Sequence, residues 1–305
     1  MGFASNHAIA AENVWIIIPV HNRRATTARC LEHLSELGVL AWSRLLVVDD
    51  GSSDGTLSML EHDFPSVEVV LGDGQLWWSG AIRLGMETAI KNGADCIVWL
   101  NDDTLPRRGS LEHLVSLAVG GSSICGGVSR TSSETFFYSG GLMHRRWPQR
   151  LKSVPETEVG PLPVEWLHGN MVAIPASVWL RVGLPESRWM KHTFADIEYT
   201  LRGHRAGIPV LLVPAAQAAA ECNDSASYWS WADPRLSWWD VLGGFGSPKV
   251  WWYFPGLVYF KLTTAGLAGA VDCFWVCLKA LFLGVFKGIP IRKLTQNINK
   301  TNGGH

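Results

Sequence analysis

The chain has 305 residues, of which 47% are hydrophobic and 17% are charged. This length and composition allow one large folded domain or two smaller ones and exclude an intrinsically disordered protein. The formal net charge of -1 provides no basic field, so nucleic acid is not an expected partner.

The cysteines and the first residues indicate the compartment. None of the six cysteines has the paired C-x-x-C spacing of a zinc site, and we expect free thiols in a reducing cytoplasm. The N-terminus lacks the basic segment and apolar run of a signal peptide. These features together predict a cytoplasmic protein.

The first half of the chain alternates between short apolar runs and segments with helical spacing. The runs of strand length cover residues 14–19, 44–48, 67–71 and 96–100. The helical segments between them cover residues 26–37, 57–63 and 80–92. This alternation predicts an α/β fold of Rossmann type, a mostly parallel sheet with right-handed crossovers. No G-x-G-x-x-G follows the first run, so the dinucleotide-binding fingerprint is missing.

The second half, which completes a first domain of residues 1–228, has a less regular pattern. We expect helices over residues 110–119, 177–182 and 194–206. We expect strands over residues 124–129, 134–143 and 208–213 and at the end of 164–175. The polar, proline-containing segment 145–163 predicts a flexible loop over the site.

The tail, residues 229–305, is rich in tryptophan and almost entirely apolar between residues 251 and 289. On one continuous helix of about 100° per residue, Lys261, Asp272 and Lys279 would form a single charged stripe. Such an amphipathic helix favours a place in a membrane interface over a bilayer crossing. A buried helix or an oligomerisation helix is the alternative.

Carboxylates follow two of the predicted strands, where an open α/β sheet presents its ligands. Asp49 and Asp50 follow residues 44–48, while Asp102 and Asp103 follow residues 96–100. Adjacent carboxylates at the end of a buried strand are costly unless their charge is compensated. The pair Asp102 and Asp103 suits Mg²⁺ or Mn²⁺ with a phosphorylated substrate as a further ligand. A solvated acidic turn is the alternative for the second pair taken alone.

The order of several motifs resembles glycosyltransferase family 2, the inverting enzymes with the GT-A nucleotide-sugar fold. The motifs are P-V-H-N-R at 19–23, V-D-D-G-S-S-D-G-T at 48–56, N-D-D at 101–103, and A-D followed by L-R and A-G at 195–207. The resemblance covers about residues 14–225. Two further segments, L-W-W-S-G-A at 76–81 and E-W-L-H-G-N at 165–170, look most like bacterial rhamnosyltransferases, which use dTDP-rhamnose to build cell-surface polysaccharide.

The resemblance implies a nucleotide-binding half (14–104), an acceptor-binding half (105–228) and a role for each matched residue. Asp196 would be the general base, and Asp103 with Asp102 would hold a divalent metal, Mg²⁺ or Mn²⁺. The nucleotide would contact Pro19, His21, Arg23, Asp49, Asp50, Ser52, Gly80, Arg83, Asn101 and Asp102. The donor sugar and the acceptor would lie beside Trp77, Trp78, Trp166, His168, Gly169, Asn170, Asp196 and Arg202, with the tryptophans stacking on sugar faces.

Several of these residues have a simpler structural interpretation when taken alone. Asp196 could be only a first-turn acid of its helix, His168 a structural hydrogen bonder and Arg83 an exposed helix residue. Trp77 and Trp78 could belong to the core.

The chain also departs from the family pattern. Asn101 replaces the first aspartate of D-x-D, and Ala195 replaces an acid before the base. Many relatives have a metal-binding histidine after the last strand, a place that falls here at residues 220–224. That ligand is therefore absent or replaced by Cys222, Asn223 or Asp224.

The motifs together predict an inverting hexosyltransferase that moves rhamnose from dTDP-rhamnose to a lipid-linked glycan or polysaccharide. Peripheral membrane contact at the inner face of the cell membrane and a homo-oligomer are further expectations. One alternative is a UDP-sugar donor, such as the galactofuranose, N-acetylglucosamine or glucose derivative. The other is a catalytically silent subunit that binds sugar nucleotide, which the changes at residues 101 and 195 would permit.

Overall fold

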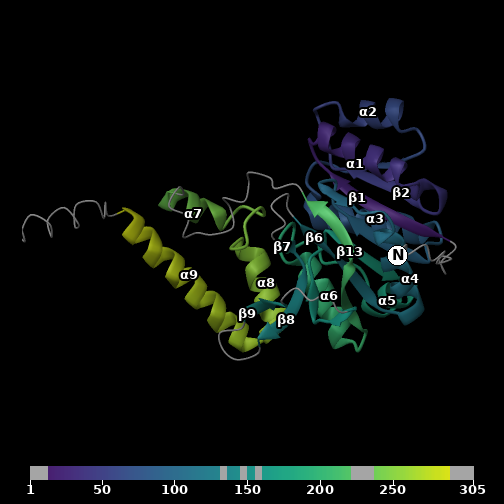
Figure 1. Cartoon of the computed structure of the whole chain (residues 1–305). Helices are drawn as coiled ribbons and strands as arrows, with labels where there is room; N and C mark the ends of the chain where they lie inside the picture. The colour runs from purple at the N-terminus through teal and green to yellow at the C-terminus, as the bar shows by residue number, and fades with distance from the viewer. Residues whose placement is uncertain (1–12, 131–135, 145–149, 155–159, 221–236, 289–305) are drawn as a thin grey trace, which may run out of the picture. The chain divides into compact units, whose positions relative to one another are not determined.

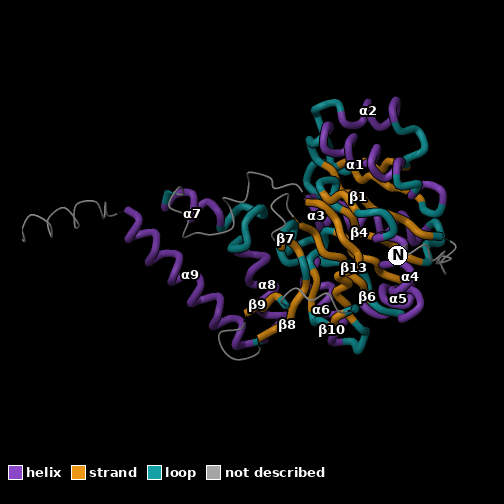
Figure 2. Tube along the Cα trace, viewed as in Figure 1, coloured by secondary structure: helices purple, strands orange, loops and turns teal. Residues whose placement is uncertain are grey.

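The structure is a computed structural model that describes residues 13–130, 136–144, 150–154, 160–220 and 237–288. It divides into two compact units, residues 1–222 and 223–305, close to the boundary that the sequence predicts at residue 228. Figure 1 labels the elements of both units, and Figure 2 colours them by secondary structure. Each unit is described by itself below.

The first unit contains a ten-stranded sheet in the order β10-β13-β6-β12-β4-β1-β2-β3, with β5 beside β13 and β7 beside β6. The strands of this sheet are β1 (Val14–Val20), β2 (Arg44–Asp49), β3 (Glu68–Leu71), β4 (Cys96–Leu100), β5 (Thr104–Pro106), β6 (Ile124–Arg130), β7 (Phe136–Tyr138), β10 (Leu162–Pro163), β12 (Met171–Pro175) and β13 (Val210–Ala220). A second sheet joins β8 (Gly140–His144), β9 (Arg150–Ser153) and β11 (Trp166–Leu167) in the order β11-β8-β9.

The predicted α/β fold class is confirmed, and the parallel part of the large sheet is confined to certain strands. Strands β3, β2, β1 and β4 are all parallel, and the apolar runs of β1, β2 and β4 are buried on both faces, as is usual for parallel strands. Strand β12 runs antiparallel to both β4 and β6, whereas β6 and β13 are parallel. The sheet is therefore mixed, with four parallel strands from residues 14–100 and a further parallel pair formed by β6 and β13.

Helices cover both faces of the large sheet. They are α1 (Arg24–Glu36), α2 (Thr56–Asp63), α3 (Trp77–Lys91), α4 (Ser110–Gly121), α5 (Ala176–Val182) and α6 (Ala195–Arg205), with a 3₁₀ turn at Val39–Ala41. Helices α1, α2 and α4 pack against one face, where Ile16 and Val98 point. Helices α3, α5 and α6 pack against the other, where Ile17 and Trp99 point. This alternation along β1 and β4 follows from the two-residue period of strands.

Several sequence-based boundaries are wrong. Strand β13 continues past the predicted end at residue 213 to Ala220, with an irregular register against β6 between Leu212 and Gln217. Helix α3 begins at Trp77 rather than Gly80, because the Asp50 carboxylate accepts a hydrogen bond from the Trp77 N–H. The predicted strand 134–143 is divided at Ser139 into β7 and β8 in its described part. The predicted loop 145–163 contributes β9 and β10, which find backbone partners in β8 and β13.

The second unit consists of α7 (Trp238–Gly244), α8 (Phe254–Ala265) and α9 (Leu267–Gly288) in its described part. The helical conformation is interrupted between α8 and α9 at Gly266, which has a left-handed φ of 57°. The single charged stripe predicted for this region is therefore wrong. Lys261 lies on α8 and Asp272 on α9, and the two form a buried ion pair of 3.1 Å. Among the described helices, none combines the length and hydropathy needed to cross a bilayer.

Candidate active site

The loop after β2 presents two buried carboxylates that are held by backbone N–H groups. Asp50 accepts hydrogen bonds from the N–H groups of Gly74 at 2.8 Å and Trp77 at 2.9 Å. Asp49 accepts one from the Ser52 N–H at 3.0 Å. Gly72 packs so tightly against Asp50 that an added Cβ would lie 2.6 Å from its Oδ1. Asp50 therefore fixes the loop between β3 and α3 and the start of that helix.

The residues after β1 are tied to the same loop. His21 Nδ1 donates to the backbone oxygen of Asp50 at 2.6 Å, and the Asn22 N–H donates to Ser52 Oγ at 2.8 Å. Pro19 is partly exposed just before them and pairs with β2 at Val48. The sequence-based site omits Asn22, although its φ of 53° is a conformation that asparagine tolerates better than most residues. Its place in the P-V-H-N-R motif was the available signal.

The N-D-D segment after β4 meets a cation from the end of β1. Arg23 forms ion pairs with Asp102 at 3.1 Å and with Asp103 at 3.0 Å. Asp102 is buried and also accepts a hydrogen bond from Thr27 Oγ1 at 3.2 Å. Burial raises the pKa of Asp102 to about 7, and the Asp103 charge adds to this, while the Arg23 guanidinium opposes it. The sequence predicts that Arg23 contacts the nucleotide and does not predict these ion pairs with Asp102 and Asp103.

The residues available to a divalent cation are few. Within the described ranges, no three His, Cys, Asp or Glu side chains gather as a metal cage. Asp103 retains a partly exposed carboxylate, whereas Asp102 is occupied by Arg23 and Thr27. This donor set fits a Mg²⁺-like ion that binds through one carboxylate, water and substrate phosphates. The alternative ligands Cys222, Asn223 and Asp224 lie outside the described residues.

Asp196 is positioned by backbone N–H groups at the first turn of α6. Its Oδ2 accepts from the Gly169 N–H at 2.7 Å, and its Oδ1 accepts from the Ile197 N–H at 2.8 Å. Each carboxylate oxygen has a second lone pair, so Asp196 can still accept a proton or another hydrogen bond. The residue two before it, Phe194, has a left-handed φ of 71°, a strained conformation for an aromatic residue.

A continuous series of contacts joins the predicted nucleotide loop to Asp196. Trp78 follows the Asp50-bonded Trp77 and donates its indole N–H to Asn101 Oδ1 at 2.8 Å. The Asn101 N–H donates to the backbone oxygen of Asn170 at 3.0 Å. Gly169 completes the series, because its N–H bonds Asp196 and an added Cβ would lie 2.6 Å from the Trp78 ring. Segments far apart in the sequence thus meet around Gly169.

His168 and Trp166 lie just before Gly169 and have structural partners. His168 Nδ1 lies 3.1 Å from the backbone oxygen of Ser139, and its ring packs edge-on against Trp166. Burial lowers the pKa of His168, while the nearby Asp196 charge opposes that effect. Trp166 is 2% exposed, so its ring has no free face for a sugar. The stacking role predicted for Trp166 is therefore wrong.

Three other predicted residues are engaged in packing. Arg202 donates to the backbone oxygens of Val182 and Leu184 and pairs with Glu198 at 3.1 Å. Arg83 donates to Glu87 at 2.9 Å and to the backbone oxygen of Pro185 at 3.1 Å. Gly80 is buried against Leu76. These contacts stabilise α3 and α6. The N–H groups of Arg202 and Arg83 that take part in them are directed at protein oxygens rather than at a ligand site.

Trp77 keeps a partly exposed ring, which lies edge-on to His192 with centroids 6.4 Å apart. It also has a left-handed φ of 57°. A tryptophan in this conformation is a true outlier, and such strain persists where surrounding contacts impose it. Of the three tryptophans predicted to stack on sugars, only Trp77 and Trp78 have partly exposed side chains.

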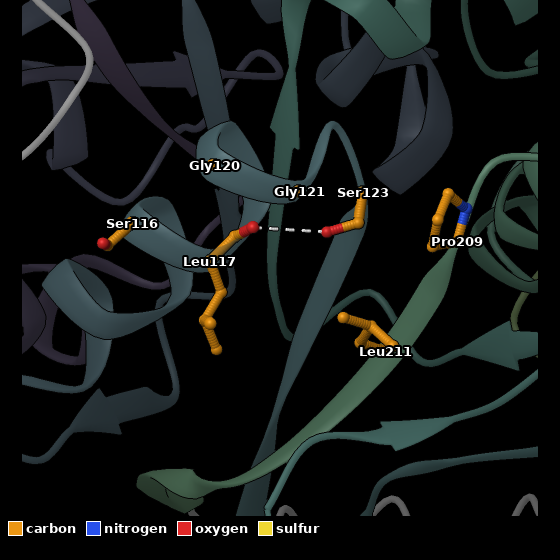
Figure 3. A pocket seen from close by; sticks show the side chains of 7 residues that line it. All are labelled: Ser116, Leu117, Gly120, Gly121, Ser123, Pro209 and Leu211. Carbon is orange, nitrogen blue, oxygen red and sulfur yellow. Dashed lines mark hydrogen bonds between the residues drawn. The ribbon is translucent and has the colours of Figure 1, made fainter.

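The cavity drawn in Figure 3 lies elsewhere in the first unit, between the end of α4 and the start of β13. It measures about 340 Å³ and is lined by Ser116, Leu117, Gly120, Gly121, Ser123, Pro209 and Leu211. None of the predicted site residues contributes to this lining. The side-chain contacts described above, rather than this hollow, define the candidate site.

Comparison with known proteins gives a family and a fold. Residues 15–173, more than half of the chain, match the family described as Glycosyl transferase family 2. No curated protein sequence matches the chain. The crystal structure of GalNAc-T7 with UDP, GalNAc and Mn²⁺ is similar with a TM-score of 0.59 and 15% identity, over 85% of this chain and 52% of that one.

The structure of residues 1–349 of TarS from S. aureus is similar with a TM-score of 0.52 and 11% identity, over 75% of this chain and 65% of that one. Its complex with UDP-GlcNAc gives a TM-score of 0.53 and 12% identity, over 77% and 67%. The chain thus spans about half of the GalNAc-T7 chain and about two thirds of the TarS chain. At these identities the likenesses show a shared fold.

Proposed function

The chain belongs to glycosyl transferase family 2, and on that premise we propose that it transfers a sugar from a nucleoside-diphosphate donor with inversion at the anomeric carbon. The observation that carries the proposal is the series of contacts from Asp50 through Trp78, Asn101 and Gly169 to Asp196. It supports a donor site beside a positioned carboxylate, which is the arrangement that a single displacement needs.

In the proposed reaction, Asp196 is the general base. It removes the proton of an acceptor hydroxyl while that oxygen attacks the anomeric carbon and the bond to the diphosphate breaks. The Gly169 and Ile197 N–H groups keep the carboxylate oriented for this transfer. Asp49 and Asp50, with His21 and Ser52 beside them, would receive the nucleotide.

The charge of the leaving diphosphate must be offset. Arg23 is the resident cation nearest the N-D-D segment, and Asp103 is the carboxylate we propose for a divalent metal. A bound Mg²⁺ or Mn²⁺ would supply a counter-charge for the diphosphate. Mn²⁺ in the GalNAc-T7 crystal supports this part of the proposal by fold likeness.

The donor is proposed at a finer level than the family. Segments 76–81 and 165–170 resemble those of rhamnosyltransferases, which favours dTDP-rhamnose and a lipid-linked glycan or polysaccharide at the inner face of the cell membrane as acceptor. A UDP-sugar is the second candidate, because the solved neighbours are described with UDP or UDP-GlcNAc. A homo-oligomer remains a separate proposal without a described interface.

The test is a donor panel of dTDP-rhamnose and UDP-sugars, with binding and hydrolysis or transfer measured in the presence of Mn²⁺, Mg²⁺ or EDTA. Asp196→Asn should retain nucleotide binding and lose turnover. Glu112→Gln is a matched control, because it alters a first-turn acid of α4 instead. Turnover of a UDP-sugar but not of dTDP-rhamnose would contradict the proposed rhamnose donor and leave the proposed mechanism unchanged. Equal turnover in wild type and Asp196→Asn would show that Asp196 is not the general base. Nucleotide binding without turnover of any donor would favour the catalytically silent subunit.

A further inference from the structure

Helix α9 exposes a stripe of large apolar side chains, which we call the α9 stripe. It consists of Leu267, Val271, Phe274, Trp275 and Leu278. At about 100° per residue these five side chains fall within an arc of about 100° on the helix. Leu267 is 86% exposed, Phe274 64% and Trp275 51%. So large a continuous apolar face on a helix marks an interaction site rather than ordinary surface.

The opposite side of α9 is fixed by contacts within the second unit. Asp272 is buried and pairs with Lys261 of α8 at 3.1 Å, and the Cys273 thiol points to the backbone oxygen of Leu257 at 3.8 Å. Val276 packs against the small cluster that contains Trp252. Turning the α9 stripe inward would expose this cluster and separate a buried ion pair, which is costly. The helix therefore presents the stripe outward.

The charge of the chain beyond Asp272 indicates the chemistry of the partner. This segment contains no acidic residue, and its basic residues are Lys279, Lys287, Arg292, Lys293 and Lys300. Lys279, on α9 close to the edge of the stripe, is exposed. A second copy of the chain would bring the same basic segment and no acidic residue from it. Anionic lipid headgroups complement both the apolar stripe and this charge.

We propose that α9 lies in the plane of an anionic bilayer, with the α9 stripe inserted among the acyl chains and Lys279 at the level of the lipid phosphates. Trp275 suits this depth, because indole rings favour the membrane–water interface. The inference goes beyond the proposed function and does not depend on it, since it involves no residue of the candidate active site.

The test uses the full chain and two kinds of vesicle, phosphatidylcholine alone and phosphatidylcholine with about one third phosphatidylglycerol. Wild type should sediment with the anionic vesicles and bind the neutral ones about tenfold more weakly, and added salt should weaken the anionic binding. The double variant F274E/W275E should lose about tenfold or more of this binding. Leu180→Glu is the matched control, because Leu180 is 79% exposed on α5 of the first unit.

Equal unfolding temperatures of wild type and F274E/W275E would show that the variant is folded. Absence of wild-type binding to anionic vesicles, or unchanged binding by the folded double variant, would overturn the proposal. A wild-type dimer by light scattering that F274E/W275E converts to a monomer without vesicle binding would assign the α9 stripe to a second copy instead. Donor hydrolysis without vesicles is measured on the same samples, and its failure would count against the proposed function alone.

Discussion

The loop after β2 and the loop after β4 each place two adjacent carboxylates at the end of a buried strand, and they stabilise them differently. Asp49 and Asp50 accept hydrogen bonds from backbone N–H groups. Asp102 and Asp103 share the guanidinium of Arg23. Backbone N–H groups fix the geometry of a loop, whereas an ion pair leaves a carboxylate for which another cation can compete. In the proposed function, the loop after β2 would be a rigid surface for the nucleotide, and the loop after β4 would be a site where a cation can balance the diphosphate charge.

Asp196 belongs with the first kind, because it too is held by backbone N–H groups, and it provides the largest expected effect. Asp196→Asn should lower turnover about 10²–10⁴-fold, since the amide can still accept the Gly169 N–H but cannot take a proton. Nucleotide affinity and unfolding temperature should stay close to wild type. The measurement is transfer rate beside nucleotide titration. A loss of nucleotide binding equal to the loss of rate would show that Asp196 binds the nucleotide and is not the general base.

Asp50→Ala tests the N–H-bound loop directly. Two backbone N–H groups lose their acceptor, so the free energy of unfolding should fall by about 3 kcal/mol. Chemical denaturation measures this, with Asp73→Ala as control, because exposed Asp73 accepts only the Gln75 N–H among the bonds described. A change for Asp50→Ala as small as that for Asp73→Ala would contradict the role of Asp50 as the fixed point of α3.

Asp102→Asn tests the ion-paired loop through pH. The folded-state pKa of Asp102, about 7, lies above its ordinary value of 3.8. Between these two pH values the folded protein therefore retains a proton that the unfolded chain releases. This group therefore lowers the free energy of unfolding, by about 3 kcal/mol, as pH rises from 4 to 7.

Asp102→Asn should remove that slope from denaturation curves recorded across the range, whereas Asp73→Asn should retain it. An unchanged slope in the Asp102 variant would mean that Arg23 fully compensates the charge of Asp102 in the folded protein.

The smallest expected effect concerns Asp54, an exposed carboxylate that bonds the N–H groups of Arg24 at 2.9 Å and Thr56 at 3.1 Å. Asp54→Ala should lower the free energy of unfolding by about 1 kcal/mol, as for the loss of a helix cap. The Thr56 hydroxyl also donates a hydrogen bond to Asp54 and lowers the pKa of that carboxyl, so the contribution is present above pH 4 and lost in more acidic solution. Equal denaturation midpoints of wild type and variant at pH 7 would contradict it.

The parallel half of the fold was predictable because its signals are local. Val14–Val20, Arg44–Asp49 and Cys96–Leu100 each contain a continuous apolar run, and each run is followed by polar residues of the candidate site. Buried parallel strands have this pattern regardless of what lies elsewhere. The motif residues Asp50, Asn101 and Asp196 also stand in local sequence patterns, and their functional roles stay predictions.

What the sequence did not reveal depends on distant partners. Strand β9 forms because β8 is available, and Arg23 reaches Asp102 and Asp103 across about eighty residues. Trp166 looks like a sugar platform in sequence, but its burial is decided by the β8–β11 sheet and His168. In the tail, one continuous helix was assumed, and the break at Gly266 changed which face each charge occupies.

Asn101 has a consequence for the charge balance of the site. It bonds the Trp78 indole through an oxygen that an aspartate would also provide, so the uncharged form does not weaken that contact. With Asn101, the side chains of Arg23, Asp102 and Asp103 together carry one formal negative charge rather than the two that an aspartate would give. A single divalent cation would then leave this group positive, opposite in sign to a diphosphate. With the proposed metal bound, the departure from D-x-D would therefore make the proposed site more attractive to an anionic donor.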